Sequence, residues 1–183
     1  MQDDASQTIE EDTPLLSGKK YLSGETATVT YRAKKGYYFP GNYSVSVSDT
    51  TAATAVVARS EDAATITVKV TIVSDGQDIA VTLPAATAKT TPDAPAGLSG
   101  GVGTISGVTN AMEYSKDPNA KEWNAIGGIS DSGNAEINDL EAGDWYVRYK
   151  ETATTNPSAA QTVKVKGIGK ATVAVENVNY GIK

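Results

Sequence analysis

Short stretches in which apolar and polar residues alternate one by one recur along this chain of 183 residues. Residues 26–33 place alanine, valine or tyrosine at every second position with threonine or arginine between them, and residues 65–72 repeat the pattern with isoleucine and valine. A period of two is typical of β-strands with one buried face. Glycine, proline, asparagine and aspartate turns separate the stretches at spacings of roughly 8–12 residues, as in sandwiches and small barrels. The sequence therefore predicts an all-β fold with two tandem β-sandwich domains.

A change of composition divides the chain near residues 87–93. Pro84 ends the alternation of the first half, and the following residues are rich in threonine and proline, which favour extended and semi-rigid linkers. The second half starts with a glycine-dense run and later alternates again, so that Trp145, Val147 and Tyr149 are expected in its core. The boundaries that we predict are a flexible acidic lead-in at 1–17, a first domain at 18–88, a second domain at 93–167, and an extra strand or the start of a truncated third module at 168–183.

The chain contains no histidine and no cysteine. Histidine is the commonest general base and metal ligand, and cysteine supplies thiolate chemistry, so both absences favour a passive module over an enzyme. The formal net charge of the chain is −6, so the chain lacks the excess of basic residues that nucleic-acid binding requires. No stretch approaches the roughly 18 apolar residues of a membrane span, and Met1 is followed by polar residues rather than by a secretion signal. We expect no cofactor, no metal, no nucleic-acid partner and no membrane insertion, and we expect a piece of a longer secreted chain.

The second half carries residues that resemble fibronectin type III and related immunoglobulin-like modules. These are Ala94-Pro95, residues 112–115 followed by Trp123, and residues 140–149. The run at 140–149 is similar to the pattern of those modules in which leucine and an alanine-glycine pair precede an aromatic residue and Val-Arg. Such modules form a tyrosine corner there, whereas here Trp145 stands one residue earlier than the usual tyrosine. The resemblance implies an immunoglobulin-like β-sandwich in the second domain.

The first half is similar to short repeats of large bacterial surface proteins. In those repeats a threonine-rich strand leads to Gly-Tyr, an aromatic residue and proline, and then to two further strands. The matching residues are 28–31, 36–40, 44–47 and 65–68. The resemblance implies an immunoglobulin-like surface-repeat domain at 18–88 and a bacterial source.

Two patterns could carry catalysis. Residues 97–101 fit the letters of the nucleophile elbow G-x-S-x-G, with Ser99 as the nucleophile. The elbow needs a strand-to-helix turn and a histidine base, so a glycine-rich entry loop is the preferred interpretation. Paired carboxylates could hydrolyse glycosides without histidine, but most acids of the second half fall in expected turns or on solvent faces, and we predict that the chain is not an enzyme. These acids are Glu113, Asp117, Glu122, Asp131, Glu136, Asp139, Glu141 and Asp144.

Oxygen-rich turns at 74–78 and 130–134 could bind calcium, which takes about six to eight oxygen ligands. Neither turn matches an EF-hand loop, and side chains that cap ordinary turns explain both. A Lys–Asn isopeptide crosslink would need a buried lysine, whereas Lys69 and Lys164 alternate onto polar faces. The sequence therefore predicts no metal ligand and no crosslinking residue.

Aromatic side chains could form a sugar-binding platform. Tyr37, Tyr38, Phe39 and Tyr43 are close in sequence, and Trp123 lies beside a turn. The favoured interpretation is that these rings fill cores that are short of leucine and phenylalanine. The faces of Tyr38 and Trp123 stay open, and burial of both would count against a platform.

We predict a non-catalytic structural spacer, stalk or adhesion fragment of a bacterial cell-surface or secreted protein, located outside the cell. The alternative is a carbohydrate-binding or accessory module of a larger secreted hydrolase. The ligand-binding residues stay unassigned, the partner is an unidentified protein or glycan, and we expect a monomer within a longer multidomain chain. Hydrogen-bonded sheets would resist extension, and the linker would set the reach of the pair.

Overall fold

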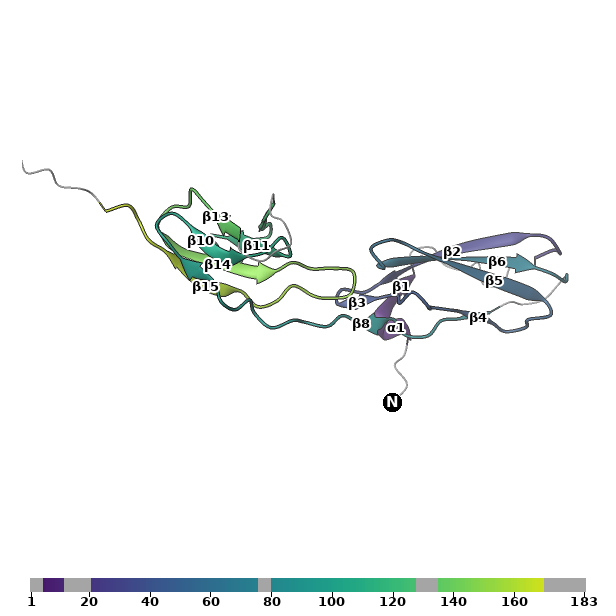
Figure 1. Ribbon diagram of the computed structural model, residues 1–183. Helices are drawn as coiled ribbons and strands as arrows, with labels where there is room; N and C mark the ends of the chain where they lie inside the picture. The colour runs from purple at the N-terminus through teal and green to yellow at the C-terminus, as the bar shows by residue number, and fades with distance from the viewer. Residues whose placement is uncertain (1–4, 12–20, 76–79, 128–134, 170–183) are drawn as a thin grey trace, which may run out of the picture. The chain divides into compact units, whose positions relative to one another are not determined.

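The structure is a computed structural model that describes residues 5–11, 21–75, 80–127 and 135–169 (Figure 1). Its contacts divide the chain into unit 1, Met1–Asp93 with Lys150–Ala159, and unit 2, Ala94–Tyr149 with Ala160–Lys183. Strands dominate both units, and the one helix among the described residues is α1 (Ala5–Thr8). The fold is all-β with two tandem β-sandwich units, as predicted. Nearly all of the predicted extra strand or third module at 168–183 lies outside the described residues.

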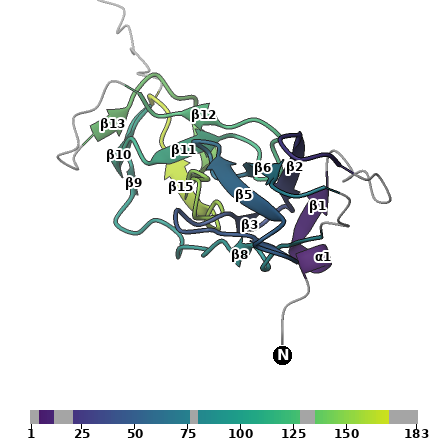
Figure 2. The same ribbon diagram turned by 90° about the vertical axis from the view of Figure 1, so that its right-hand side faces the viewer.

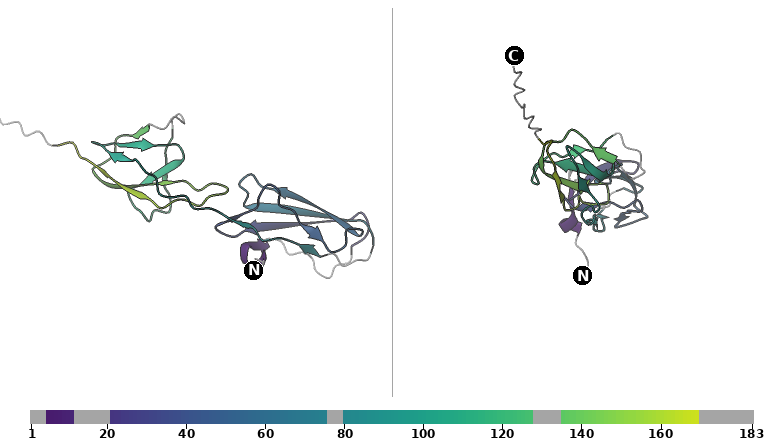
Figure 3. Two further views of the ribbon diagram at one scale, coloured as in Figure 1. Left: turned by 60° about the horizontal axis from the view of Figure 1, so that its bottom comes forward. Right: turned by 60° about the vertical axis from the view of Figure 1, so that its left-hand side comes forward.

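Unit 1 has two layers, which can be followed in Figures 1 and 3. The larger sheet has the order β1-β2-β6-β5 with antiparallel neighbours. Its strands are β1 (Ile9–Glu11), β2 (Thr26–Ala33), β6 (Thr65–Ile72) and β5 (Ala53–Arg59). The second layer pairs β3 (Tyr37–Tyr38) with β8 (Thr87–Ala88) and β4 (Ser46–Val47) with β7 (Val81–Thr82). If β3 and β4 are taken as parts of one third strand, the larger sheet has the A-B-E-D order of an immunoglobulin sandwich.

The alternation in the sequence builds the core of unit 1. On β6 the four apolar residues from Ile66 to Ile72 are at most 3% exposed, and on β2 Val29 and Tyr31 are buried beside them. Phe39, which follows β3, is fully buried. Burying a branched or aromatic side chain of this kind stabilises a fold by about 1.5–3 kcal/mol. The strand faces predicted to be apolar are therefore the faces that hold the two layers together.

Residues 5–11 correct the prediction of a flexible lead-in at 1–17. Ile9 lies opposite Ala33 in the β1–β2 ladder and is 8% exposed. Thr8 is also buried, and its Oγ1 accepts a hydrogen bond from the backbone N–H of Ala86 at 2.9 Å. A single isoleucine among acidic residues has no periodicity, and its partner strand lies far along the chain, so this strand could not be recognised from the sequence. The other residues of the predicted lead-in lie outside the described part.

Unit 2 is a second two-layer sandwich, with sheet orders β13-β10-β9 and β12-β11-β14-β15. Strands β9 to β13 and β15 are labelled in Figure 2. All neighbouring strands within these sheets are antiparallel. The strands are β9 (Ser99–Gly100), β10 (Ile105–Val108), β11 (Met112–Ser115), β12 (Asn124–Ala125), β13 (Ala135–Ile137), β14 (Gly143–Tyr149) and β15 (Gln161–Val165). The buried core comprises Ile105, Val108, Met112, Ile126, Ala135, Ile137, Val147, Val163 and Val165.

Trp145 takes the place of a tyrosine corner at the start of β14. Its indole N–H donates a hydrogen bond to the backbone carbonyl of Glu141, four residues upstream, at 2.9 Å. In immunoglobulin-like folds a tyrosine hydroxyl makes the corresponding bond to backbone a few residues upstream. Val147 is fully buried, as predicted, while Trp145 and Tyr149 are half-buried and pack against the core.

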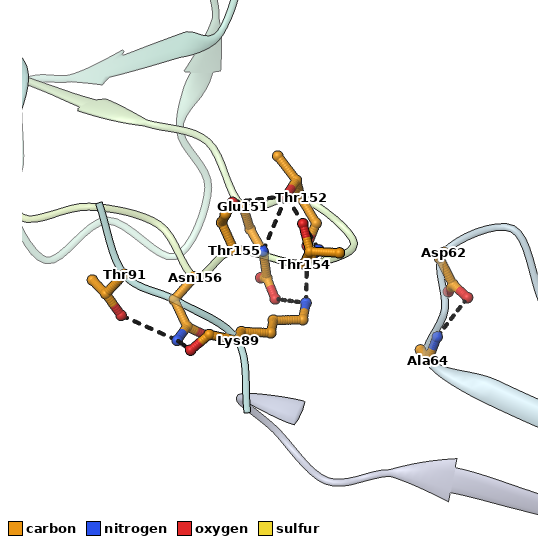
Figure 4. A network of polar contacts seen from close by, with 9 residues as sticks. All are labelled: Asp62, Ala64, Lys89, Thr91, Glu151, Thr152, Thr154, Thr155 and Asn156. Carbon is orange, nitrogen blue, oxygen red and sulfur yellow. Dashed lines mark hydrogen bonds and ion pairs between the residues drawn. The ribbon is translucent and has the colours of Figure 1, made fainter. Parts of the chain in front are cut away.

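The segment 150–159, which connects β14 to β15, belongs to unit 1 by its contacts. The Nζ atom of Lys89 lies 2.7 Å from Oε1 of Glu151 (Figure 4). The backbone N–H of Asn156 donates to the carbonyl of Thr90 at 2.8 Å. The sequence placed this segment in the second domain, because its position along the chain does not show which residues it contacts.

Candidate functional site

The outer face of the sheet β12-β11-β14-β15 carries a group of charged and aromatic side chains. Val147 is fully buried, so its neighbour Arg148 is on the opposite face of β14. The strand register places Arg148 opposite Glu113 of β11. Trp123 precedes β12 and lies against Arg148. Glu113, Trp123 and Arg148 are called the Trp123–Arg148 cluster below.

Arg148 is held from two directions within this cluster. Its Nε atom lies 2.7 Å from Oε1 of Glu113, and its guanidinium carbon lies 4.0 Å from the centroid of the Trp123 ring. The side chains of Arg148 and Glu113 are only 25% and 16% exposed. The indole N–H of Trp123 donates to the carbonyl of Ala120 at 3.0 Å, which fixes the ring. The guanidinium therefore covers one face of the indole, and that face is closed to a stacking sugar.

A second cluster lies at the start of β14. The Nζ atom of Lys116 lies 5.4 Å from the centroid of the Trp145 ring and pairs with the carboxylate of Glu141. The hydrogen bond and the charge of Lys116 hold the pKa of Glu141 below its ordinary value. A general acid in glycoside hydrolysis needs a raised pKa, so this carboxylate is suited to an ion pair and not to proton donation.

The other acids that the sequence offered for catalysis take part in turns and strand pairs or lie in solvent. The hydroxyl of Ser106 donates to Glu136 at 2.6 Å, and Asp117 accepts a hydrogen bond from the backbone N–H of Asn119 at 2.9 Å. Asp139 has a φ of 60°, a left-handed conformation that aspartate tolerates. Glu122 and Asp144 are exposed, and Asp131 lies outside the described residues.

These contacts show how the candidate acids are distributed. Each of three glutamates binds a different partner: Glu113 binds an arginine, Glu136 a serine and Glu141 a lysine. Within the described residues the hydrogen bonds and ion pairs join no two of the candidate acids. The arrangement supports strand pairing and surface ion pairs.

Ser99 has the surroundings of a strand residue. It lies in β9, is exposed, and is followed by Gly103 at a φ of 67° and then by β10. A Cβ atom on Gly100 would lie 1.9 Å from the carbonyl oxygen of Lys164, so glycine permits the close approach of β15. Residues 97–101 therefore enter the sandwich and do not form the strand-to-helix turn of a nucleophile elbow.

The aromatic run of unit 1 belongs largely to the core. Phe39 is fully buried, and Tyr43 meets it edge-on with ring centroids 4.9 Å apart. Tyr37 also packs against this core, while Tyr38 is half-buried. The hydroxyl of Tyr43 donates to the carbonyl of Pro84, and burial raises the pKa of Tyr43 to about 12. Tyr37, Phe39 and Tyr43 therefore pack in the core, as the favoured interpretation predicted, whereas Tyr38 is not part of this cluster. Trp123 is half-buried against Arg148 and does not belong to the core of unit 2, so the interpretation was wrong for this ring.

The candidate calcium turns are only partly described. The carboxylate of Asp75 accepts a hydrogen bond from the backbone N–H of Ser23 at 2.5 Å. Residues 76–79 and the whole turn at 130–134 lie outside the described part. Among the residues that the structure does describe, no three histidine, cysteine, aspartate or glutamate side chains form a group that could hold a metal ion. Lys69 and Lys164 are exposed, on the polar faces where alternation places them.

Two open hollows lie apart from the Trp123–Arg148 cluster. One, of about 510 Å³, is lined by residues 44–46 and 82–85 of unit 1, which are hydroxyl-bearing or apolar. The other, of about 500 Å³, lies in unit 2 along residues 102–104, 138–142 and 166–168. Its charged lining includes Glu141, whose carboxylate is already paired with Lys116. The residues that line these two hollows do not form a recognisable arrangement of catalytic side chains.

The partnership of Arg148 with Glu113 was not found from the sequence. Alternation puts each residue on an outer face, but only the register of β11 against β14 places them opposite each other. The same holds for Trp123, whose contact with Arg148 depends on where a loop returns to the sheet. The available signal was an arginine on the outer face of one predicted strand and a glutamate on another.

No helix among the described residues combines the length and the apolar character needed to cross a membrane. No protein family matches the chain, and no curated protein matches it. A solved structure described as "Tandem Ig repeats of Dlar" is similar over 88% of this chain and 99% of that chain, at 14% sequence identity and a TM-score of 0.23. A likeness at this score carries no argument, so the fold assignment depends on the strand order and the buried faces.

Proposed function

We propose that this chain is a non-catalytic structural spacer, stalk or adhesion fragment of a bacterial cell-surface or secreted protein. The observation that carries the proposal is the use of its charged and aromatic side chains within the sandwich. Arg148 and Glu113 join β14 to β11, and Lys116 covers Trp145 at the start of β14. The residues best equipped for chemistry are thus engaged in structural contacts.

The longest ladders of unit 1 suit a load-bearing role. Strands β2 and β6 have eight residues each and pair from Thr26↔Thr71 to Arg32↔Thr65. Strand β6 is also paired along β5, so it is held on both sides. Extending this unit requires rows of backbone hydrogen bonds to break together. Pro92 and Pro95 give the connection to unit 2 the composition of a semi-rigid linker.

The finer assignments belong to the same proposal. Unit 2 has one three-stranded sheet and one four-stranded sheet. Fibronectin type III modules share this seven-stranded sandwich architecture, which supports a fibronectin type III-like module. The bacterial source and the location outside the cell are supported by the resemblance of the first half to surface repeats. The partner remains an unidentified protein or glycan.

A glycan array with the full chain separates the spacer from the carbohydrate-binding alternative. Wild-type protein and the variants Trp123→Ala and Tyr38→Ala are compared after circular dichroism has confirmed that all are folded. A spacer gives no retained glycan in any of the three samples. Binding that disappears in Trp123→Ala and survives in Tyr38→Ala would overturn the spacer assignment and establish a carbohydrate-binding module.

A further inference from the structure

Strand β5 is the edge of the larger sheet of unit 1, and it lacks the usual protection of an edge. Its seven residues, ATAVVAR, contain no proline, no glycine and no charge before Arg59. It pairs with β6 in one continuous register without a bulge. Val56, in the middle of the strand, is 67% exposed. Natural edge strands are commonly shortened, charged, bulged or covered, because an open edge pairs with other strands.

The opposite edge of the same sheet shows the contrast. Strand β1 has only three residues, and one of them is the exposed, charged Glu10. Short length and charge are both devices that discourage pairing. The sheet therefore has one protected edge and one open edge.

The hydrogen bonds at the two ends of β5 show which of its backbone groups face the open side. The N–H of Ser60 donates to the carbonyl of Thr65 at 2.9 Å, and the N–H of Val73 donates to the carbonyl of Ala52 at 2.8 Å. Antiparallel pairs alternate between hydrogen-bonded and non-hydrogen-bonded positions, so the even-numbered residues of β5 bond to β6. The N–H and C=O groups of Ala55 and Val57 therefore point away from β6, and no hydrogen bond within the described residues occupies them.

We propose that two copies of this chain associate by antiparallel pairing of β5 with β5 about a two-fold axis at Val56. Ala55 of each copy then lies opposite Val57 of the other, and each of these pairs exchanges two backbone hydrogen bonds. All the open groups of Ala55 and Val57 are satisfied by this one arrangement. The surface goes beyond the proposed function, which does not depend on it, and it replaces the expectation of a monomer.

The side chains favour a second copy as the occupant. Val56 meets its symmetry mate in a non-hydrogen-bonded pair, where Cα atoms approach to about 4.5 Å and side chains make their closest contact. The exposed apolar side chain at the centre of the strand is thereby covered by an identical one. Arg59 falls opposite Ala53, so the two arginines do not face each other. A two-fold interface of this kind is closed and uses the same patch on both copies.

Sedimentation of the full chain over a concentration series tests the association. Pairing along one seven-residue strand buries little surface, so we expect a weak dimer with a dissociation constant on the order of 0.1–1 mM. Val56→Lys places a charge at the centre of the edge and is expected to weaken association at least ~10-fold. The matched control is Val73→Lys, because Val73 is another exposed valine of unit 1, at 52%, and lies outside the edge. Circular dichroism checks that both variants are folded.

A cysteine variant tests the register directly, since the chain has no cysteine of its own. Val56→Cys places two thiols across a pair whose Cα separation of about 4.5 Å lies within the range of disulfides. In a glutathione redox buffer Val56→Cys is expected to form a covalent dimer at least ~10-fold faster than Val73→Cys, because pairing brings its two thiols together. The proposal is overturned if the wild type is monomeric at about 1 mM, if Val56→Lys dimerises like the control, or if the two cysteine variants crosslink at equal rates.

Discussion

Replacing Trp145 by phenylalanine tests the corner of unit 2. The substitution keeps an aromatic ring against the core and removes the indole N–H that donates to the carbonyl of Glu141 at 2.9 Å. The smaller ring also makes less contact with Tyr114, whose ring centroid lies 5.8 Å from that of Trp145, and it weakens the contact with Lys116. Three separate contributions therefore change at one position.

Their sizes can be compared. A neutral hydrogen bond contributes about 0.5–1.5 kcal/mol, and the lower part of this range applies because the region around Glu141 is exposed and water can replace the donor. An exposed cation–π contact contributes about 0.5–1 kcal/mol, of which phenylalanine keeps a part. With the smaller ring included, Trp145→Phe is expected to destabilise unit 2 by about 1–2 kcal/mol. A domain of this size then melts roughly 4–8 °C lower for each kcal/mol.

Urea unfolding followed by tryptophan fluorescence measures the effect. The chain has two tryptophans, Trp123 and Trp145, and both lie in unit 2, so Trp123 reports on this unit in the variant. Lys116→Met is the control, because it removes the cation and leaves the indole hydrogen bond, and it is expected to cost about half as much. The reasoning is refuted if Trp145→Phe is as stable as the wild type, or if Lys116→Met causes the whole loss.

Three further predictions concern other contacts. Arg148→Met leaves Glu113, whose side chain is 16% exposed, without its partner, so the unfolding free energy of unit 2 in urea is expected to fall by about 1–3 kcal/mol. The double variant Arg148→Met/Glu113→Gln should lose less stability, and an equal loss would contradict a paired role. The pKa of Tyr43 is raised to about 12, which means that the folded state favours the neutral phenol. The contribution of the neutral Tyr43 phenol to stability is therefore present below about pH 10 and is lost as the pH rises towards 12. The difference in unfolding free energy between wild type and Tyr43→Phe should fall by roughly 1–2 kcal/mol across that window, with solvent screening at this half-buried ring allowed for. A difference that stays constant with pH would contradict this reasoning. Lys89→Met removes the ion pair with Glu151 and is expected to speed hydrogen exchange at the amide of Asn156 several-fold without affecting β6, whereas unchanged exchange would show that the segment 150–159 is held by other contacts.

Local periodicity accounts for what the sequence predicted correctly. The alternation in residues 65–72 needs only the geometry of a strand to show that Ile66 and Val68 face inward and Lys69 outward. The same reasoning placed Val147 in the core of unit 2. The position of Phe39 in the core followed from the shortage of other large apolar residues.

Contacts between distant segments account for what the sequence did not show. Ile9 is buried only because β1 joins the edge of β2, and a three-residue strand has too little periodicity to be recognised. Arg148 meets Glu113 through the register of two strands, which alternation leaves undetermined. Trp145 showed the expected aromatic character, but its hydrogen bond to Glu141 depends on the shape of the turn before β14.

Stretching single molecules held at Ala5 and Gly169 tests the load-bearing role most directly. The expected result is a set of discrete unfolding peaks, with the released chain extending by about 3.5 Å per residue. Arg148→Met should lower the force of the peak that belongs to unit 2 and leave that of unit 1 unchanged. Smooth extension without peaks, in a chain that circular dichroism shows to be folded, would contradict a mechanical function for these sandwiches.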